Sequence, residues 1–245
     1  MNRLNLPRKI YFKPGSMQVA LRELSEIYQL KRAFLVSGPG DLAALTVVGD
    51  WLRRCGLRTA EFFTIGDPPS FADIRSAQPK LGEFEPDVIV GVGGGAAMSA
   101  AKAMWAVYEN PELDLKREET ITTGKKAKLV LVATDLESGA QNSPFALLKD
   151  DEGAPCELKS FALLPEISVA DAELLKKLSP EQRTEASQGL LTRCLAALET
   201  ADEYTNGLLE EAVRLIKENQ TDRPEALEKL QSAAALYGAA CGNMN

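Results

Sequence analysis

The segment from Asp87 to Lys102 constrains the fold of this chain most strongly. It begins with the run DVIVGV, which is apolar almost throughout and therefore favours a strand buried on both faces. Gly93, Gly94 and Gly95 follow, and a helical stretch of small residues comes next. A buried strand that leads through glycines into a helix is typical of a βαβ unit in a parallel sheet.

The same alternation of strand and helix extends through the first half of the chain. Residues 145–164 hold two apolar runs around the charged tip 149–153, which predicts a β-hairpin. Residues 116–126 are charged and lack periodicity, which predicts a surface excursion. Further strands are predicted over 9–12, 33–37, 59–65 and 128–133, and helices over 16–28, 41–55 and 71–81. We therefore expect an α/β domain with a mainly parallel sheet.

From Asp171 onward the pattern becomes helical. The periodic stretches are DAELLKKL, TEASQGLLTRCLAALETADEY, GLLEEAVRLIKEN and PEALEKLQSAAALYGAAC. We place a boundary between Pro165 and Asp171, which divides the chain into an α/β domain over 1–168 and a helical domain over 169–245.

Composition excludes several classes of function. The 245 residues contain no histidine, which excludes His-based catalytic triads and zinc proteases. The formal net charge of -7 leaves no basic excess, so nucleic acid is not an expected partner. No uncharged apolar stretch reaches the roughly 18 residues of a membrane span, and the start of the chain lacks an apolar signal region. We therefore expect a cytoplasmic protein without a membrane partner. We also expect the cysteines to be reduced and mostly buried, and Cys194 to be a core residue.

The glycine turn, Gly93 to Gly95, has two interpretations. The free N–H groups at the start of the following helix can bind an anion such as a phosphate, and glycine lets the backbone approach it closely. The alternative is a tight turn whose alanines pack on the sheet. The spacing differs from GxGxxG and does not decide between them.

The order of several segments resembles a known family. These are LPRKIYFKPGS, VSGPG, GDPP, PDVIVGVGGGAAMSAAKAMW, PFALLKDDEG, ALLPEISVADAELL and SAAALYGAACGN. Together they are similar to the iron-containing (group III) alcohol dehydrogenases, above all to the alcohol dehydrogenase half of bifunctional aldehyde/alcohol dehydrogenases. The resemblance implies a dehydroquinate synthase-like fold, in which a Rossmann-like nucleotide-binding domain precedes an all-helical domain, with NAD(P) and a divalent metal between them.

The resemblance also implies a set of cofactor-binding residues, from which this chain departs. Ala96 replaces a serine and Ser99 an aspartate of the family motif. Asp135 and Glu137 place negative charge where the family has hydroxyls and amides around a pyrophosphate, which weakens anion binding. For Lys159, a cleft-facing position and a solvent-facing strand position both stay open. The residues that match the cofactor site are Gly93, Gly94, Gly95, Ser99, Ser138 and Lys159.

The family's metal is held by one Asp and three His. Asp171 matches the Asp, but the chain supplies no histidine, so we expect this position to hold no metal. The acidic residues of 150–152 could hold a hard cation, although a solvated hairpin tip is the favoured interpretation.

The last segment, SAAALYGAACGNMN, resembles a helix that the family continues with further helices. The chain is either a truncated product or a short natural paralogue, and we favour the paralogue because the loop 133–143 also departs from the family. In either case Ala233 to Ala235 and Ala239-Ala240 are expected to form an exposed apolar face, and hence a homo-oligomer or a complex with a full-length relative.

Two functional hypotheses follow. The first is a catalytically inactive homologue with a binding, scaffolding or regulatory role and residual nucleotide binding. The second is an NAD(P)-dependent alcohol dehydrogenase completed by a partner chain, since the glycine turn, Lys102 and Asp171 are retained.

Overall fold

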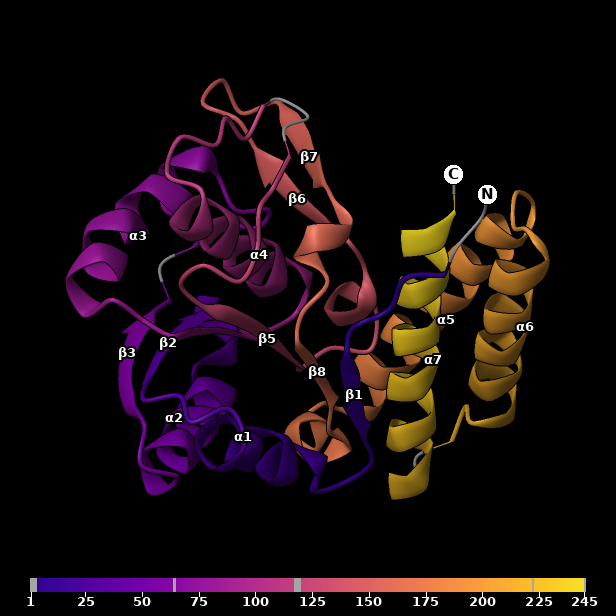
Figure 1. Cartoon of the computed structure of the whole chain (residues 1–245). Coiled ribbons are helices and arrows are strands. Elements are labelled where there is room, and N and C mark those ends of the chain that lie inside the picture. The colour runs from indigo at the N-terminus through magenta and orange to yellow at the C-terminus, as the bar shows by residue number, and fades with distance from the viewer. Residues whose placement is uncertain (1–3, 64, 117–119, 222, 245) are drawn as a thin grey trace.

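A computed structural model describes residues 4–63, 65–116, 120–221 and 223–244. These residues form a six-stranded sheet in the order β1-β8-β5-β4-β2-β3, in which every neighbouring pair is parallel (Figure 1). The predicted parallel sheet is therefore confirmed. The strands are β1 (Lys9–Phe12), β2 (Arg32–Ser37), β3 (Arg58–Phe62), β4 (Val88–Gly93), β5 (Lys128–Ala133) and β8 (Ile167–Ala170).

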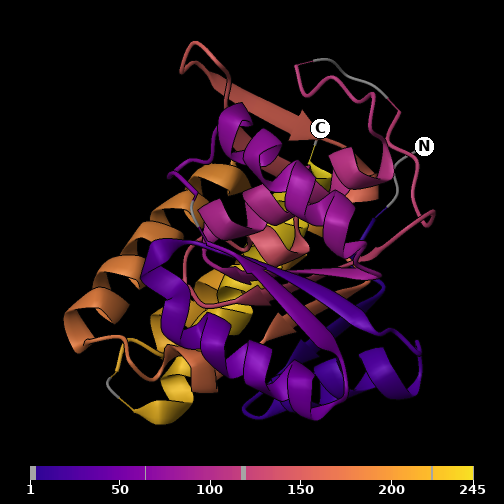
Figure 2. The same ribbon diagram turned by 90° about the vertical axis from the view of Figure 1, so that its left-hand side faces the viewer.

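Helices cover both faces of this sheet. Helices α1 (Ser16–Glu26) and α2 (Leu42–Arg54) lie on one face, and α3 (Phe71–Phe84) and α4 (Gly95–Glu109) lie on the other (Figures 1 and 2). Successive side chains of a strand point to opposite faces of the sheet. Val90 therefore packs against the α1 and α2 side, and the adjacent Ile89 packs against the α3 and α4 side. This two-sided burial explains why the β4 segment is apolar almost throughout.

The predicted hairpin is also present. Strands β6 (Phe145–Lys149) and β7 (Pro155–Lys159) pair antiparallel and form a separate two-stranded sheet on the α4 side of the molecule (Figure 1). The backbone N–H of Leu147 donates to the Ser99 hydroxyl of α4 at 3.1 Å, which helps to attach the hairpin to the α/β layers.

Beyond the α/β layers, two expectations need correction. The stretch DAELLKKL forms only a short 3-10 turn, η4 (Ala172–Leu175), and the long stretch that begins at Thr184 is divided between two helices. The Asp202 side chain causes this division, because it accepts the N–H groups of Tyr204 and Thr205 and so begins a new helix. The helices are α5 (Pro180–Leu198), α6 (Glu203–Glu218) and α7 (Pro224–Asn243).

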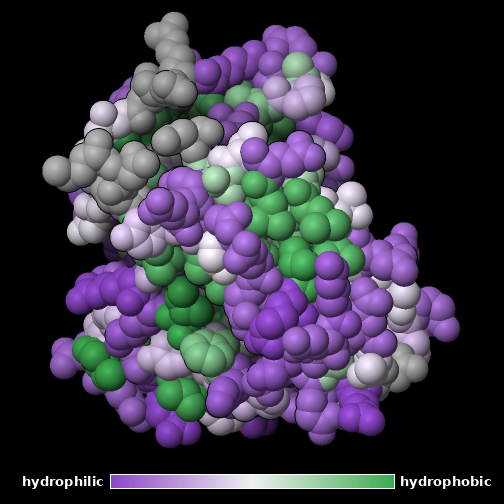
Figure 3. All heavy atoms as spheres, turned by 90° about the vertical axis from the view of Figure 1, so that its right-hand side faces the viewer, coloured by the Kyte–Doolittle hydropathy of each residue, from purple (hydrophilic) through white to green (hydrophobic). Residues whose placement is uncertain are grey.

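Helices α5 to α7 share a core that includes Leu190, Leu209 and Ile216 and lie beside the β1–β8 side of the sheet (Figure 1). The expectation that the alanines of α7 form an exposed face is wrong. All of them are buried, because α7 packs against the short helix η2 (Ala140–Asn142) as well as against α5 and α6. Figure 3 shows that the surface on this side is largely polar, with one large apolar patch and several smaller apolar areas. Among the described residues we find no helix with the length and hydrophobicity of a membrane span.

Candidate functional site

The strand order brings three loops together at the carboxyl edge of the sheet. Strand β4 lies between β2 and β5, so the loops that follow these strands are neighbours. Along the sequence, β3 pairs with one side of β2, and the next strand, β4, pairs with the other side. The direction of strand order therefore reverses between β2 and β4, which makes this a topological switch point. Open α/β sheets bind their ligands at such a point. The glycine turn therefore lies where the fold class places a ligand site.

The glycine turn lies in direct contact with carboxylates. Gly93 has a φ of +149°, and a Cβ atom there would lie 2.8 Å from Oδ2 of Asp41. A Cβ atom at Gly94 would lie 2.8 Å from Oδ2 of Asp135. The positive φ of Gly93 requires glycine there, and a side chain at Gly94 would have to displace the Asp135 carboxylate.

Asp135 caps the N-terminus of α4. Its Oδ2 accepts the backbone N–H of Gly95 at 3.1 Å, and its Oδ1 accepts the Ser138 hydroxyl at 3.1 Å and the Ser138 N–H at 3.3 Å. Burial raises the pKa of the Asp135 carboxyl. The N–H group that would bind a phosphate is thus already bonded to a side chain of the same chain.

Asp41 is a site residue that the sequence interpretation treated only as a helix start. The Thr134 hydroxyl donates to its Oδ1 at 2.6 Å. This bond crosses the end of β4 and places a second carboxylate beside Gly93. The parallel strand order is the signal that could have revealed it, because it sets the loop after β2 next to the loop after β4.

The structure brings together four of the six predicted cofactor residues, namely Gly93, Gly94, Gly95 and Ser138. Ser99 is buried on the hairpin side of α4, where its hydroxyl accepts the N–H of Leu147. Lys159 is exposed on β7, in line with its solvent-facing interpretation. The family's NAD(P) does not fit this arrangement as it stands, because the Asp135 carboxylate bonds to the Gly95 N–H at which a phosphate would bind.

Lys102 lies in α4, the helix that begins at the glycine turn, and is completely buried. Its Nζ donates to the carbonyl oxygens of Ala140 and Ser143 at 2.7 Å each and of Phe145 at 2.8 Å. Burial lowers the pKa of Lys102 to about 7. The side chain therefore ties α4 to the segment between β5 and β6, and it has no direct access to a ligand.

Asp171, which matches the metal-binding Asp of the family, has a structural role in this chain. It is 1% exposed, and its two oxygens accept the N–H groups of Gly15 at 3.1 Å, Met17 at 3.0 Å and Glu173 at 3.0 Å. The described residues include no group of three or more His, Cys, Asp or Glu side chains that could hold a metal. The donor set in this chain does not fit the family's Asp and His ligands.

The acidic hairpin tip does not form a cation site either. Lys116 pairs with Asp150 at 3.0 Å and with Glu152 at 2.8 Å, and Arg75 pairs with Asp151 at 2.5 Å. Basic side chains from outside the hairpin thus neutralise the carboxylates.

The cysteine expectation holds only in part. All four thiols are free, but Cys194 is the one that is fully buried, and the others are partly exposed. Burial raises the pKa of Cys194 to about 12, which agrees with a core thiol rather than a nucleophile.

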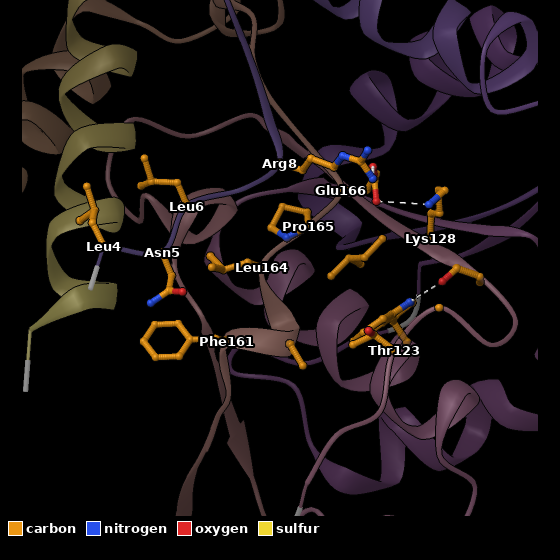
Figure 4. A pocket seen from close by; sticks show the side chains of 15 residues that line it. Leu4, Asn5, Leu6, Arg8, Thr123, Lys128, Phe161, Leu164, Pro165 and Glu166 are labelled. Carbon is orange, nitrogen blue, oxygen red and sulfur yellow. Dashed lines mark hydrogen bonds and ion pairs between the residues drawn. The ribbon is translucent and has the colours of Figure 1, made fainter. Parts of the chain in front are cut away.

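A cavity of about 510 Å³ lies at the opposite edge of the sheet (Figure 4). The side chains of Leu4, Leu6 and Phe161 line one part of it, and Lys128 and Glu166 form an ion pair of 3.2 Å at another. The cavity borders the amino ends of β5 and β8, whereas the glycine turn follows the carboxyl end of β4, so the two are separate features.

Comparison with known proteins agrees with this architecture. The family described as iron-containing alcohol dehydrogenase matches residues 7–172. The aldehyde-alcohol dehydrogenase of Clostridium acetobutylicum is 32% identical over 262 residues, covering 97% of this chain and 30% of that protein. The bifunctional aldehyde-alcohol dehydrogenase of Escherichia coli K12 is 31% identical over 265 residues, covering 97% and 29%. The solved structure of a 1,3-propanediol oxidoreductase superposes with a TM-score of 0.91 at 23% identity, covering 100% of this chain and 68% of that one.

The chain thus spans about 30% of the length of the bifunctional relatives. The structural match extends over all of it, which confirms the dehydroquinate synthase-like fold implied by the resemblance. From the family match and these relatives together, we conclude that the chain belongs to the iron-containing alcohol dehydrogenase family.

Proposed function

We propose that this chain is a catalytically inactive member of its family with a binding, scaffolding or regulatory role. The main support is the hydrogen bond from the Gly95 N–H to the Asp135 carboxylate. This bond occupies an N–H group at the helix N-terminus where a dinucleotide phosphate would bind. The absence of histidine from the sequence supports it, since the family's metal needs three such ligands.

The test is an assay of the purified chain with NAD⁺ or NADP⁺ and a short primary alcohol, with and without added Fe²⁺ or Zn²⁺. We expect no formation of reduced nicotinamide above the rate without protein. A full-length family member, assayed in parallel, controls for the quality of metal and cofactor. Metal-dependent turnover by the chain alone would contradict the proposal.

The alternative is an NAD(P)-dependent alcohol dehydrogenase whose site is completed by a partner chain. The glycine turn favours it, because this turn still joins a buried strand to a helix at the switch point of the sheet. Turnover that appears only when a full-length relative with an inactivated metal site is added would support this alternative.

We further propose that the chain associates with a second copy or with a full-length relative. Leu4, Leu6 and Phe161 support this, since these apolar side chains are 43%, 41% and 41% exposed around the cavity of Figure 4. Light scattering at micromolar concentration is expected to give a mass above that of the monomer, and Leu6→Lys should reduce it. Tyr204→Lys, which replaces a 75% exposed aromatic residue on α6, is the matched control. A monodisperse monomer for the unmodified chain would count against association.

A further inference from the structure

We propose that Asp135 acts as an internal competitor for the anion site at the N-terminus of α4, and that this one carboxylate excludes dinucleotides from the site. The inference rests on the proposed function and identifies the residue that closes the family's cofactor site in this chain. The chain retains the glycine turn of the family, but its own Asp135 carboxylate bonds to the Gly95 N–H and lies directly beside Gly94.

The geometry supports direct competition. Oδ2 of Asp135 accepts the Gly95 N–H at 3.1 Å and lies 2.8 Å from the place of a Cβ atom on Gly94. A phosphate oxygen bonded to the same N–H would have to occupy the same space, because one N–H direction serves one strong acceptor. Entry of a phosphate therefore requires Asp135 to leave.

The surrounding loop holds Asp135 in this position. Oδ1 accepts the Ser138 hydroxyl and N–H, and a Cβ atom on Gly95 would lie 3.2 Å from the Cβ of Ser138. Moving the carboxylate away would break these bonds together with the one to Gly95. The loop thus holds the Asp135 carboxylate in place as the acceptor for the Gly95 N–H. A dinucleotide would have to break the bonds of Asp135 to Gly95 and Ser138 and also overcome charge repulsion.

Charge repulsion alone does not explain the closure. Glu137 is in the same loop, but its carboxylate is directed to Arg193 at 3.6 Å, and its side chain is 50% exposed. Glu137 and Asp135 carry the same charge two residues apart, and only Asp135 bonds to the glycine turn. Glu137→Gln therefore separates the effect of charge in the loop from that of occupancy.

The experiment measures binding of ADP-ribose and NAD⁺ by calorimetry to the unmodified chain and to Asp135→Ser, Asp135→Asn and Glu137→Gln. Asp135→Ser removes charge and volume. Asp135→Asn keeps the bonds to Ser138 but places an NH₂ group, which cannot accept a bond, opposite the Gly95 N–H. Circular dichroism and thermal melting show that each variant is folded, and Asp135→Asn preserves the test if Asp135→Ser is unstable.

We expect ADP-ribose to bind Asp135→Ser or Asp135→Asn at least tenfold more tightly than the unmodified chain, with Glu137→Gln close to the unmodified chain. Equal binding by all four proteins, binding by none of the folded Asp135 variants, or an equal gain in Glu137→Gln would each overturn the inference. These outcomes are separable from failure of the proposed function, which is decided by turnover of the unmodified chain with metal and alcohol.

Discussion

Replacement of Lys102 with methionine is expected to lower the free energy of unfolding by about 3 kcal/mol. Methionine retains most of the volume of the side chain, but it cannot donate hydrogen bonds to the oxygens of Ala140, Ser143 and Phe145. These carbonyls would then be left without this donor in a site where Lys102 is 0% exposed. Chemical denaturation of both proteins measures the loss. Lys159→Met, at an exposed position of β7, is the control and should change stability by less than about 0.5 kcal/mol.

The Lys102 effect also depends on pH. Burial lowers its pKa to about 7, below the value of 10.5 in an unfolded chain. Between these two values the unfolded chain binds more protons at this residue than the folded chain, so the stability of the unmodified protein rises with pH. Lys102→Met removes this contribution, and the difference between the two proteins should widen above pH of about 7, by at most about 1.4 kcal/mol per unit. A difference that narrows over this range would contradict the prediction.

Gly238→Ala should destabilise the chain by about 3 kcal/mol, near the upper end for an overpacked core. A Cβ atom at Gly238 would lie 1.9 Å from the carbonyl oxygen of Gly139, which belongs to the backbone and cannot rotate away. Gly139 itself has a φ of +58°, and a Cβ there would lie 2.2 Å from the carbonyl oxygen of Ala234. These two glycines let α7 contact the loop that leads from Asp135 toward β6, so the substitution would also shift that loop.

The matched control for this prediction is Gly207→Ala in α6. Gly207 is exposed, and a Cβ atom there would meet nothing within 4 Å. Alanine has the higher helix propensity, so this change should raise the free energy of unfolding by up to about 1 kcal/mol. Thermal denaturation of the two variants should therefore show shifts of opposite sign. A Gly238→Ala protein as stable as the unmodified chain would show that α7 does not need the close approach.

Much of the fold could be predicted from local sequence. The predicted bounds of β1 and β5 match the structure residue for residue, because each is a short apolar run between polar or turn residues. The glycine turn also lies between a strand, β4, and a helix, α4, as the sequence predicts. These features depend on periodicity and backbone preference, which neighbouring residues determine.

The sequence pattern does not predict strand β8, for a physical reason. It has only four residues, and its sequence ISVA carries little strand signal by itself. Its burial comes from pairing with β1 and β5, which are distant in sequence. Asp171 likewise gained its structural role from Gly15 and Met17, more than 150 residues earlier, which local pattern cannot show.

The same division applies to the candidate site. The sequence by itself determined a glycine turn at the start of a helix, a histidine-free composition, and an acidic residue at 135 in the loop after β5. Tertiary structure alone decided that Asp41 lies beside Gly93 and Asp135 beside Gly94, because only the strand order β5-β4-β2 makes their loops neighbours. It also decided that Asp135 bonds to the Gly95 N–H, since hydrogen bonding requires atoms within about 3 Å and loop sequence does not specify such distances.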